Sequence, residues 1–336
     1  MVWCCPQCHD DLAPVDHDWL VCSGCAKRYE VIDGIPDLRM PGVSWVDYEA
    51  DRNAAHELAT DFSHLTADES IRWLFSRRSF WDERIIAMRT KQTFGSVERL
   101  QTDLDGWLAP MARPGFLDLG CGAATLLAAA AKRGIPGIGI DVSLLWLVVG
   151  KRLIQHHGGQ AVLAAALGEA LPLRAASVPA TITLDVIEHV ANPVHFLREI
   201  DRVVAHNGGL AFSSPNRFSL AAEPHVFVWG VGWLPRRWQG AYVQWRTGRH
   251  YESTNLLSAW EARRIVHTHT SFRAHLVVPQ VPSQEIARFP RWRATLARLY
   301  NRLAPRSAFR TLLLTVGPFF RIVSAKSAVR PLTSPS

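Results

Sequence analysis

The spacing of hydrophobic and polar positions changes twice along the chain. Residues 45–110 are polar, with widely spaced aromatic side chains and few glycines or prolines, which predicts two or three helices. From residue 115 onward, short apolar runs alternate with helical stretches that end at glycines, beginning with the strand-like GFLDL at 115–119. This alternation predicts a doubly wound α/β fold built on a parallel sheet, whose ligands bind beyond the carboxyl ends of the strands.

The alternation continues to residue 214 and is then interrupted. Residues 215–254 contain prolines, glycines, four tryptophans and five arginines, and are too long and too apolar for a simple connection. A helix and a strand then resume the pattern before a C-terminal tail. Further strands are expected at 135–140, 161–167, 179–185, 210–214 and 272–278, and helices at 123–134, 144–159, 193–209 and 255–266.

Five of the six cysteines lie in the first 25 residues and form two CxxC pairs. Two such turns bring four thiolates to one tetrahedral ion, which predicts a closed, structural zinc site. A redox CxxC motif normally opens a helix in a βαβ unit, and the surrounding sequence has no such pattern. Cys4 and His9 lie beside the first pair and could replace a ligand. The expected ligands are Cys5, Cys8, Cys22 and Cys25.

The 336 residues, 48% of them apolar, provide for an enzyme domain with small attachments. The sequence lacks both the long apolar run of a membrane span and the features of a signal peptide, so we expect a cytoplasmic protein. The net charge of +7 is local, because residues 281–336 carry +9. With leucines and aromatic residues at near-helical spacing, this tail predicts either a peripheral contact with an anionic membrane surface or a helix packed on the domain.

The stretch FLDLGCGAAT at 116–125 has the form of a nucleotide-binding loop. It lacks the third glycine of the dinucleotide fingerprint, since Thr125 stands there, and it has no P-loop lysine. A second acid, Asp141, ends the next strand, where a carboxylate can bind both ribose hydroxyls of a nucleoside. A loop without a phosphate site but with this carboxylate indicates S-adenosylmethionine as the cofactor.

Residues 115 to about 217 resemble the class I S-adenosylmethionine-dependent methyltransferases of the type 11 group, with the seven-stranded Rossmann-like sheet of that class. The matching motifs are LDLGCG, GIDVS and the run from EALPL to SSPN. Two positions differ: Ala124 replaces a family glycine, and Leu167 replaces the carboxylate that binds adenine. The resemblance implies a cofactor site made of Asp118, Gly120, Cys121, Gly122, Asp141, Val142, Gly168, Glu169 and Asp185.

Methyl transfer requires an aligned acceptor, and a base only if the acceptor must lose a proton. His189, in DVIEHV, is the first candidate for that base, although the family's Glu-His pair is often structural. His225 and Glu223 lie in a segment that resembles an acceptor cap, and they could equally serve loop hydrogen bonding. Cys121 has no activating base nearby in sequence and is expected to be an ordinary loop residue.

The leading hypothesis is an O-methyltransferase that acts on a small molecule, a glycan or a lipid-linked acceptor. One alternative is a ribosomal or transfer RNA methyltransferase, because residues 1–38 resemble zinc ribbons that partner or precede RNA-modifying methyltransferases. Another is a non-catalytic cofactor-binding or partner-activating protein. The expected parts are a zinc ribbon (1–40), a helical segment (41–110), the methyltransferase domain (111–280) with its cap insertion (215–254), and a basic helical tail (281–336).

Overall fold

The N-terminal segment folds into four short antiparallel strands. The computed structural model describes residues 2–41, 46–77, 81–108, 115–251, 254–287 and 289–326. The last two strands of the segment are joined by Asp33 and Gly34, which both adopt positive φ (50° and 73°), the conformation that a two-residue hairpin requires. The strands pair in chain order and are β1 (Leu12–Pro14), β2 (Trp19–Cys22), β3 (Arg28–Ile32) and β4 (Ile35–Pro36).

Three helices follow in residues 45–110, where the sequence predicts two or three. Asp47 caps the first, and the side chains of Thr66 and Glu69 form a capping box at the second, so local sequence fixes where both begin. The aromatic residues Trp45 and Phe80 of this segment lie outside the described residues. The helices are α1 (Tyr48–Thr60), α2 (Ala67–Ser76) and α3 (Glu83–Leu108).

A seven-stranded sheet confirms the predicted α/β fold. Its strand order is β10-β11-β9-β8-β5-β6-β7, and β5 pairs in parallel with both β6 and β8. The sheet is mixed, because β10 and β11 at one edge are antiparallel. The strands are β5 (Phe116–Leu119), β6 (Gly137–Asp141), β7 (Val162–Ala165), β8 (Val178–Leu184), β9 (Val204–Pro215), β10 (Phe272–Val277) and β11 (Phe319–Lys326).

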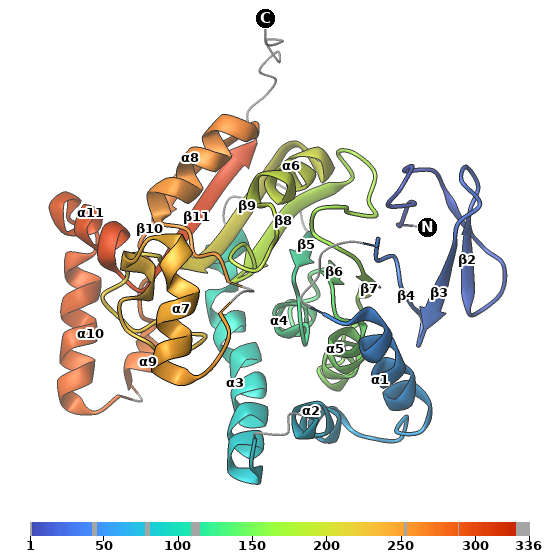
Figure 1. Ribbon diagram of the computed structural model, residues 1–336, viewed down its shortest axis with the longest axis horizontal. Coiled ribbons are helices and arrows are strands. Elements are labelled where there is room, and N and C mark those ends of the chain that lie inside the picture. Colours follow the sequence, from blue (N-terminus) through green and yellow to red (C-terminus); the bar gives the residue numbers. More distant parts are fainter. Residues whose placement is uncertain are drawn as a thin grey trace, which may run out of the picture. The chain divides into compact units, whose positions relative to one another are not determined.

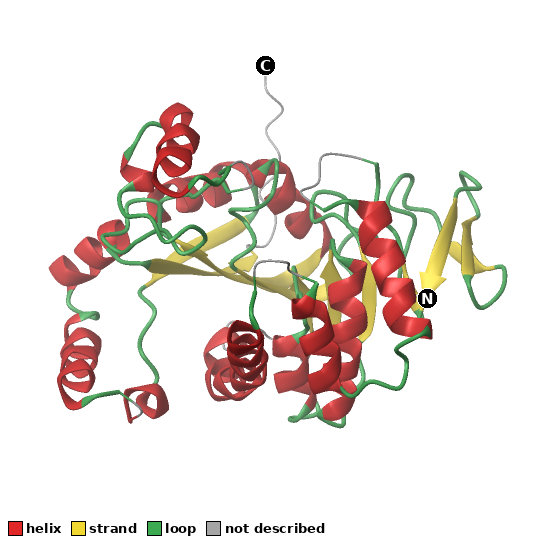
Figure 2. Ribbon diagram, turned by 60° about the horizontal axis from the view of Figure 1, so that its bottom comes forward, coloured by secondary structure: helices red, strands yellow, loops and turns green. Residues whose placement is uncertain are grey.

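The chain divides into two compact units. The first unit comprises residues 1–183 and 195–209, and it contains the N-terminal strands together with β5, β6 and β7 (Figure 1). Its helix α5 is buried along most of its length, since it packs against α1 and α2 as well as the strands. Figure 2 shows helices, in red, packed against the yellow strands. The other helices of this unit are α4 (Thr125–Ala131) and α6 (Pro193–Val203), and α5 spans Leu144–His156.

The second unit comprises residues 184–194 and 210–336. The segment 215–254 forms a small core of its own from Val228, Val231 and Val243. The tail, which we expect to be helical, contains three helices and also strand β11; its residues 288 and 327–336 lie outside the described part. The helices are η1 (Val231–Trp233), α7 (Arg236–Thr247), α8 (Ala259–His269), α9 (Ser283–Ala287), α10 (Arg291–Leu303) and α11 (Ser307–Val316).

Candidate active site and metal centre

In the first unit, the glycine-rich loop leaves β5 and turns back over the end of β6. Gly120 and Gly122 both have positive φ (76° and 50°), which explains the glycines of the motif. The amides of Gly120 and Cys121 donate hydrogen bonds to the carbonyl of Ile140, at 2.7 and 3.1 Å. A Cβ added at Gly122 would meet no atom within 4 Å, so the loop borders open space there.

Asp118 is the buried acid at the end of β5. Its side-chain atom Oδ2 has no hydrogen-bond partner among the described residues, although the residue is only 3% exposed. Burial, and after it the charge of Asp141, raise the pKa of this carboxyl group to about 8. A buried carboxyl with an unused oxygen is suited to a cationic ligand group, which would favour its ionised form.

Asp141 ends β6 with its carboxylate held by two backbone amides. Oδ2 accepts from the amide of Gly122 at 2.8 Å and Oδ1 from the amide of Ser143 at 2.9 Å. Burial raises the pKa of Asp141, and these two hydrogen bonds act in the opposite direction. The carboxylate therefore has a fixed orientation and retains lone pairs for a diol.

The turn after β7 contains the residues expected beside adenine. The amide of Ala166 donates to the carbonyl of Asp141 at 3.0 Å, so this turn is tied to the end of β6 next to Val142. Gly168 lies against Phe196 of α6, and an added Cβ would be 2.5 Å from the ring atom Cε2. Glu169 follows in the same turn.

Cys121 is buried with its side chain toward β6. A Cβ added at Gly139 would be 3.0 Å from its Sγ. Burial, followed by the charges of Asp118 and Asp141, raises the pKa of Cys121 well above its ordinary value. The thiol stays protonated, which disfavours a nucleophilic role.

Ala124, which replaces a family glycine, has a φ of 54°. For a residue with a Cβ this conformation costs about 1–2 kcal/mol, so the preference for glycine there has a local cause.

A second cluster, in the second unit, brings together Glu188, His189 and His225. One ligand atom from each lies within 4.8 Å of the others. The two imidazole rings are 4.8 Å apart between centroids and almost perpendicular, at 87°. A carboxylate with two imidazoles can move protons, and it is also a donor set that binds divalent cations.

His225 is positioned by Glu223, which is buried. The Nδ1 atom of His225 lies 2.5 Å from Oε1 of Glu223, and Oε2 accepts from the amides of His225 and Val226, at 2.9 Å each. Burial lowers the pKa of His225, but the hydrogen bond and the charge of Glu223 outweigh that effect and raise it. With Nδ1 used in this way, Nε2 is the atom that can accept a proton.

Glu188 is a site residue that the sequence analysis missed. It is only 1% exposed, and its Oε2 accepts from the hydroxyl of Ser214 at 3.1 Å. Burial, and after it the charge of Asp185, raise its pKa to about 8. Asp185 has a φ of 55° and accepts from the hydroxyl of Ser213 at 2.9 Å. The signal was present in the sequence, because Asp185, Glu188 and His189 follow β8 within one short turn.

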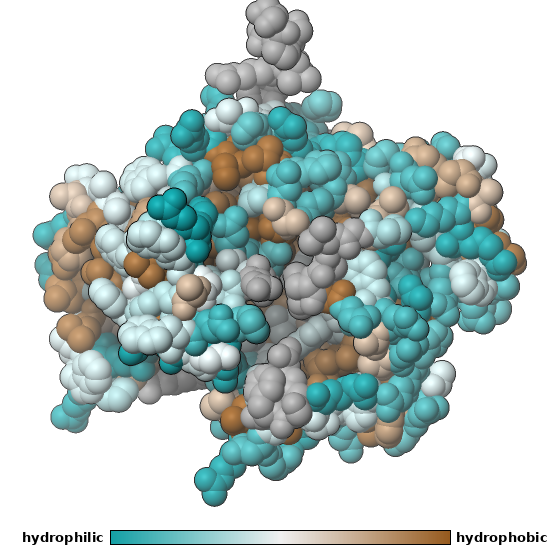
Figure 3. Space-filling view, in the orientation of Figure 1, coloured by the Kyte–Doolittle hydropathy of each residue, from teal (hydrophilic) through white to brown (hydrophobic). Residues whose placement is uncertain are grey.

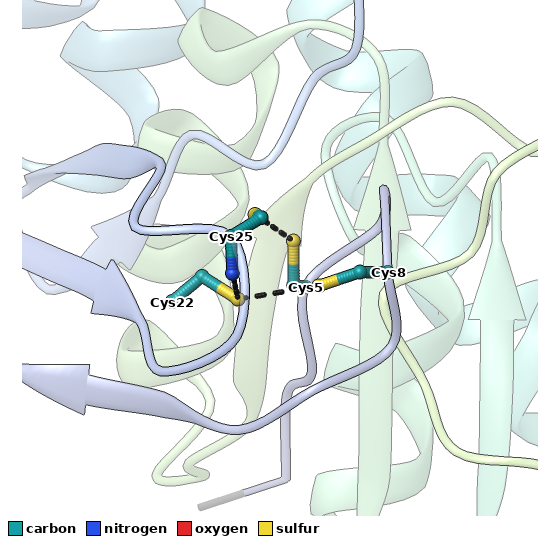
Figure 4. Close-up of side chains that lie close together, drawn as sticks. All are labelled: Cys5, Cys8, Cys22 and Cys25. Carbon is teal, nitrogen blue, oxygen red and sulfur yellow. Dashed lines mark hydrogen bonds between the residues drawn. The ribbon is translucent and has the colours of Figure 1, made fainter.

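The four cysteines of the two CxxC pairs converge in the first unit (Figure 4). Their Sγ atoms all lie within 4.8 Å of one another, with Cys8 and Cys22 3.3 Å apart and Cys5 and Cys25 3.7 Å apart. Cys4, considered as an alternative ligand, has its Sγ 4.0 Å from Nδ1 of His9. The set of four thiols is the one suited to structural zinc.

The N-terminal segment also contacts the turn beside Asp141 through Arg39, a residue that the sequence did not single out. The guanidinium donates to Asp37 through Nε and Nη2, and to Asp51 through Nη1, each at 2.7 Å. Nη1 also donates to the carbonyl of Val142 at 3.1 Å. Asp51 in turn accepts from the hydroxyl of Ser143 at 2.5 Å.

Comparison with known proteins finds similarity to methyltransferases in the middle of the chain. Residues 117–212 match the family described as "Methyltransferase domain". Ubiquinone biosynthesis O-methyltransferases of Azorhizobium caulinodans and Paracidovorax citrulli are 30% and 32% identical over 138 and 143 residues, in each case 39% of this chain. The matches cover 54% and 58% of those proteins, so the chain spans about half the length of these relatives.

Among solved structures, phosphoethanolamine N-methyltransferase 2 of Haemonchus contortus in complex with S-adenosyl-L-methionine matches with a TM-score of 0.47 and 15% identity. That match covers 87% of this chain and 62% of the other. The similarity to methyltransferases thus lies in residues 117–212, which include the loop after β5 and the end of β6.

Proposed function

We propose that the protein transfers a methyl group from S-adenosylmethionine to an oxygen of a small-molecule acceptor, with His225 as the general base. The methyltransferase domain supports the reaction class. The names of the O-methyltransferase relatives favour oxygen as the methylated atom. The single observation that carries the catalytic assignment is the pair formed by His225 and the buried Glu223, 2.5 Å apart.

The residues of the first unit fit the cofactor. The unpartnered Oδ2 of Asp118 is suited to the methionine amino group, and the fixed carboxylate of Asp141 to the ribose hydroxyls. Gly122 borders the open space that a bound ligand needs. When bound, S-adenosylmethionine supplies an electrophilic methyl group on its sulfonium. Because Leu167 stands in place of the usual carboxylate, adenine is expected to be held by the backbone at Gly168 and by packing.

His225 would accept the proton of the acceptor hydroxyl at Nε2. The hydrogen bond from Nδ1 to Glu223 fixes the tautomer in which Nε2 is unprotonated, and the negative charge of Glu223 stabilises the imidazolium that forms. Such a base typically contributes about 10²–10⁴-fold to the rate. His189 lies beside the ring and is assigned to acceptor contact.

The acceptor is expected to carry hydroxyl groups on an aromatic or sugar ring, either free or linked to a lipid. Support comes from the insertion 215–254, whose tryptophans remain exposed in the structure. Such side chains stack on rings, while His225 and Glu223 provide polar contacts. The exposed fractions are 61% for Trp229, 47% for Trp233, 54% for Trp238 and 76% for Trp245.

The test is a methyl-transfer assay with labelled S-adenosylmethionine and a panel of catechols, hydroxybenzoates and sugars, with NMR to identify the methylated atom. We expect His225→Ala to reduce kcat about 10²-fold or more. His267→Ala, which alters an exposed histidine of α8, is the matched control and should leave kcat unchanged. Equal rates for the two variants would contradict the assignment of the base.

Chelation separates the base from a metal-dependent alternative. If Glu188, His189 and His225 hold a divalent cation, EDTA will abolish activity and added magnesium or zinc will restore it. A rate unaffected by EDTA supports proton transfer by His225. Methylation of structured RNA in preference to the panel would favour the RNA alternative, and no calorimetric binding of cofactor at millimolar concentration would favour a non-catalytic protein.

We further propose that Cys5, Cys8, Cys22 and Cys25 bind a structural zinc ion. The support is the convergence of their sulfur atoms, with the hydroxyl of Tyr29 3.0 Å from Sγ of Cys5. Elemental analysis should find one zinc per chain in the purified protein, and none in Cys22→Ser. Full zinc content in Cys22→Ser, or its loss in the control variant Cys4→Ser, would contradict this ligand set.

A further inference from the structure

The tail helix α10 turns an apolar stripe toward solvent. Trp292, Leu296 and Leu299 are 68%, 56% and 50% exposed. Their spacing, with Leu303 one turn further on, is i, i+4, i+7 and i+11, which places them on one face of the helix. A single exposed leucine is ordinary in a folded protein, but a continuous stripe along three turns indicates a surface that contacts a membrane or another molecule.

The opposite face of α10 fixes this orientation. Ala294 and Ala297 pack against Ile286 of α9 in a small buried core. The hydroxyl of Tyr300 donates to the carbonyl of Pro279 at 2.8 Å, and the side-chain amide of Asn301 donates to the carbonyl of Val281 at 2.8 Å. The helix is therefore docked by its small and polar residues, and its large apolar residues are left outward.

The next helix, α11, continues the exposed apolar surface. Phe309 and Leu312 are 37% and 52% exposed and lie one turn apart, and Phe319 just after the helix is 41% exposed. Hydrophobic residues gather at the left edge of the view in Figure 3, where α10 and α11 lie in Figure 1. The two helices thus present neighbouring apolar surfaces within the second unit.

Basic side chains border the stripe. Arg291, Arg298 and Arg302 recur at i, i+7 and i+11, which places them along one flank of α10 between the exposed and the docked faces. All three are exposed. From residue 281 to the end, the sequence contains ten basic residues and one acid, Glu285. A surface that is apolar at its centre and cationic at its margin matches a bilayer with anionic headgroups.

We propose that α10, with the adjoining surface of α11, lies in the interface of an anionic lipid bilayer and docks the second unit there. A second copy of this chain is a poorer occupant, because pairing the stripes would bring two strongly cationic tails together. Among the described residues no helix is long and apolar enough to cross a membrane. Contact at the surface is therefore the mode that these helices allow. The proposal does not depend on the methyl-transfer reaction.

Vesicle flotation with the full chain tests this surface, using vesicles of neutral phosphatidylcholine and vesicles containing phosphatidylglycerol. We expect binding to the anionic vesicles and much weaker binding to the neutral ones. Arg298→Gln/Arg302→Gln should weaken the binding about 30-fold at low salt, at about fivefold for each charge near the surface. Its matched control is Arg263→Gln/Arg264→Gln, which removes two exposed charges from α8.

The apolar contribution is tested separately. Leu296→Ser should weaken binding to anionic vesicles about tenfold or more, whereas Leu220→Ser, at a leucine 60% exposed outside the tail, should not. Because both side chains are exposed, neither change should prevent folding. Equal binding of the wild type to both vesicle types, or no binding at low salt, would overturn the proposal. The proposal would also be overturned if Leu296→Ser reduced self-association or RNA binding and left vesicle binding unchanged.

Discussion

Replacing Arg39 by methionine tests whether the N-terminal segment stabilises the turn beside the cofactor loop. The guanidinium is almost fully buried, with 1% of the side chain exposed, and it lies between Asp37 and Asp51. Removing one partner of a buried ion pair typically costs about 3–5 kcal/mol. Asp37 would keep Arg52, at 3.0 Å, and Asp51 would keep its hydrogen bond from Ser143. We therefore expect a loss at the lower end, about 3 kcal/mol in the free energy of unfolding.

Urea unfolding followed by tryptophan fluorescence measures this loss, and calorimetry with S-adenosylhomocysteine measures the effect on the cofactor site. Affinity should fall as well, because Arg39 also holds the carbonyl of Val142. Lys151→Met is the matched control. Its ion pair with Asp33 is partly exposed to solvent, with 31% of each side chain exposed, and should contribute about 0–1 kcal/mol to the free energy of unfolding. Free energies for the two variants within about 1 kcal/mol of each other would refute the reasoning.

The Arg39 contribution should also depend on pH. Burial alone would raise the pKa of Asp37, but Arg39 and Arg52 outweigh that effect and lower it. The stabilisation is therefore present above the unfolded aspartate pKa of about 3.9 and is lost as the pH falls through the lower folded pKa. The difference between wild type and Arg39→Met should accordingly shrink in acid, and Arg39→Lys, which keeps the charge, should recover part of it at neutral pH.

Three further outcomes are expected. Gly168→Ala should raise the Kd for S-adenosylhomocysteine, because its Cβ would be 2.5 Å from the ring of Phe196, whereas Gly95→Ala, with no atom within 4 Å, should not; calorimetry compares them. Raising the pH should increase kcat/KM as His225 loses its proton, and Glu223→Gln should move that rise to lower pH because it removes the charge that raises the pKa; a pH–rate profile measures the shift. If the four thiols hold zinc as proposed, a chelator should lower both the melting temperature of the protein and its affinity for S-adenosylhomocysteine. An affinity that calorimetry finds unchanged would contradict this prediction.

The core of the fold and the cofactor loop could be predicted from sequence because their signals are local. The strands at the centre of the sheet are short apolar runs, and Gly120 and Gly122 are needed for the backbone conformation of the loop itself. Strand β11 could not be predicted in this way. Its sequence follows a run with helical spacing, and it becomes a strand by pairing with β10 in a register that joins Phe272 to Lys326.

The residues of the candidate site differ in the same way. Asp118 and Asp141 belong to local motifs, but the approach of His225 to Glu188 depends on how the segment 215–254 returns to the turn that contains Glu188, over 37 positions of sequence. The hydrogen bond from Arg39 to Val142 spans 103 positions. Neither contact leaves a periodic pattern, so only the folded chain shows them.

The N-terminal segment is more closely joined to the methyltransferase core than a tethered zinc module would be. The amide of Leu38 donates to the carbonyl of Ala165 at 2.8 Å, so the segment continues the hydrogen bonding at the β7 edge of the sheet, and Cys4 donates in the same way to Pro172 at 2.9 Å. An edge strand covered like this is protected from pairing with other chains. These contacts, with that of Arg39, hold both turns expected beside adenine, where Leu167 removes the usual carboxylate. If the four thiols bind zinc and these turns hold adenine as proposed, zinc would contribute to cofactor affinity by stabilising the backbone of both turns.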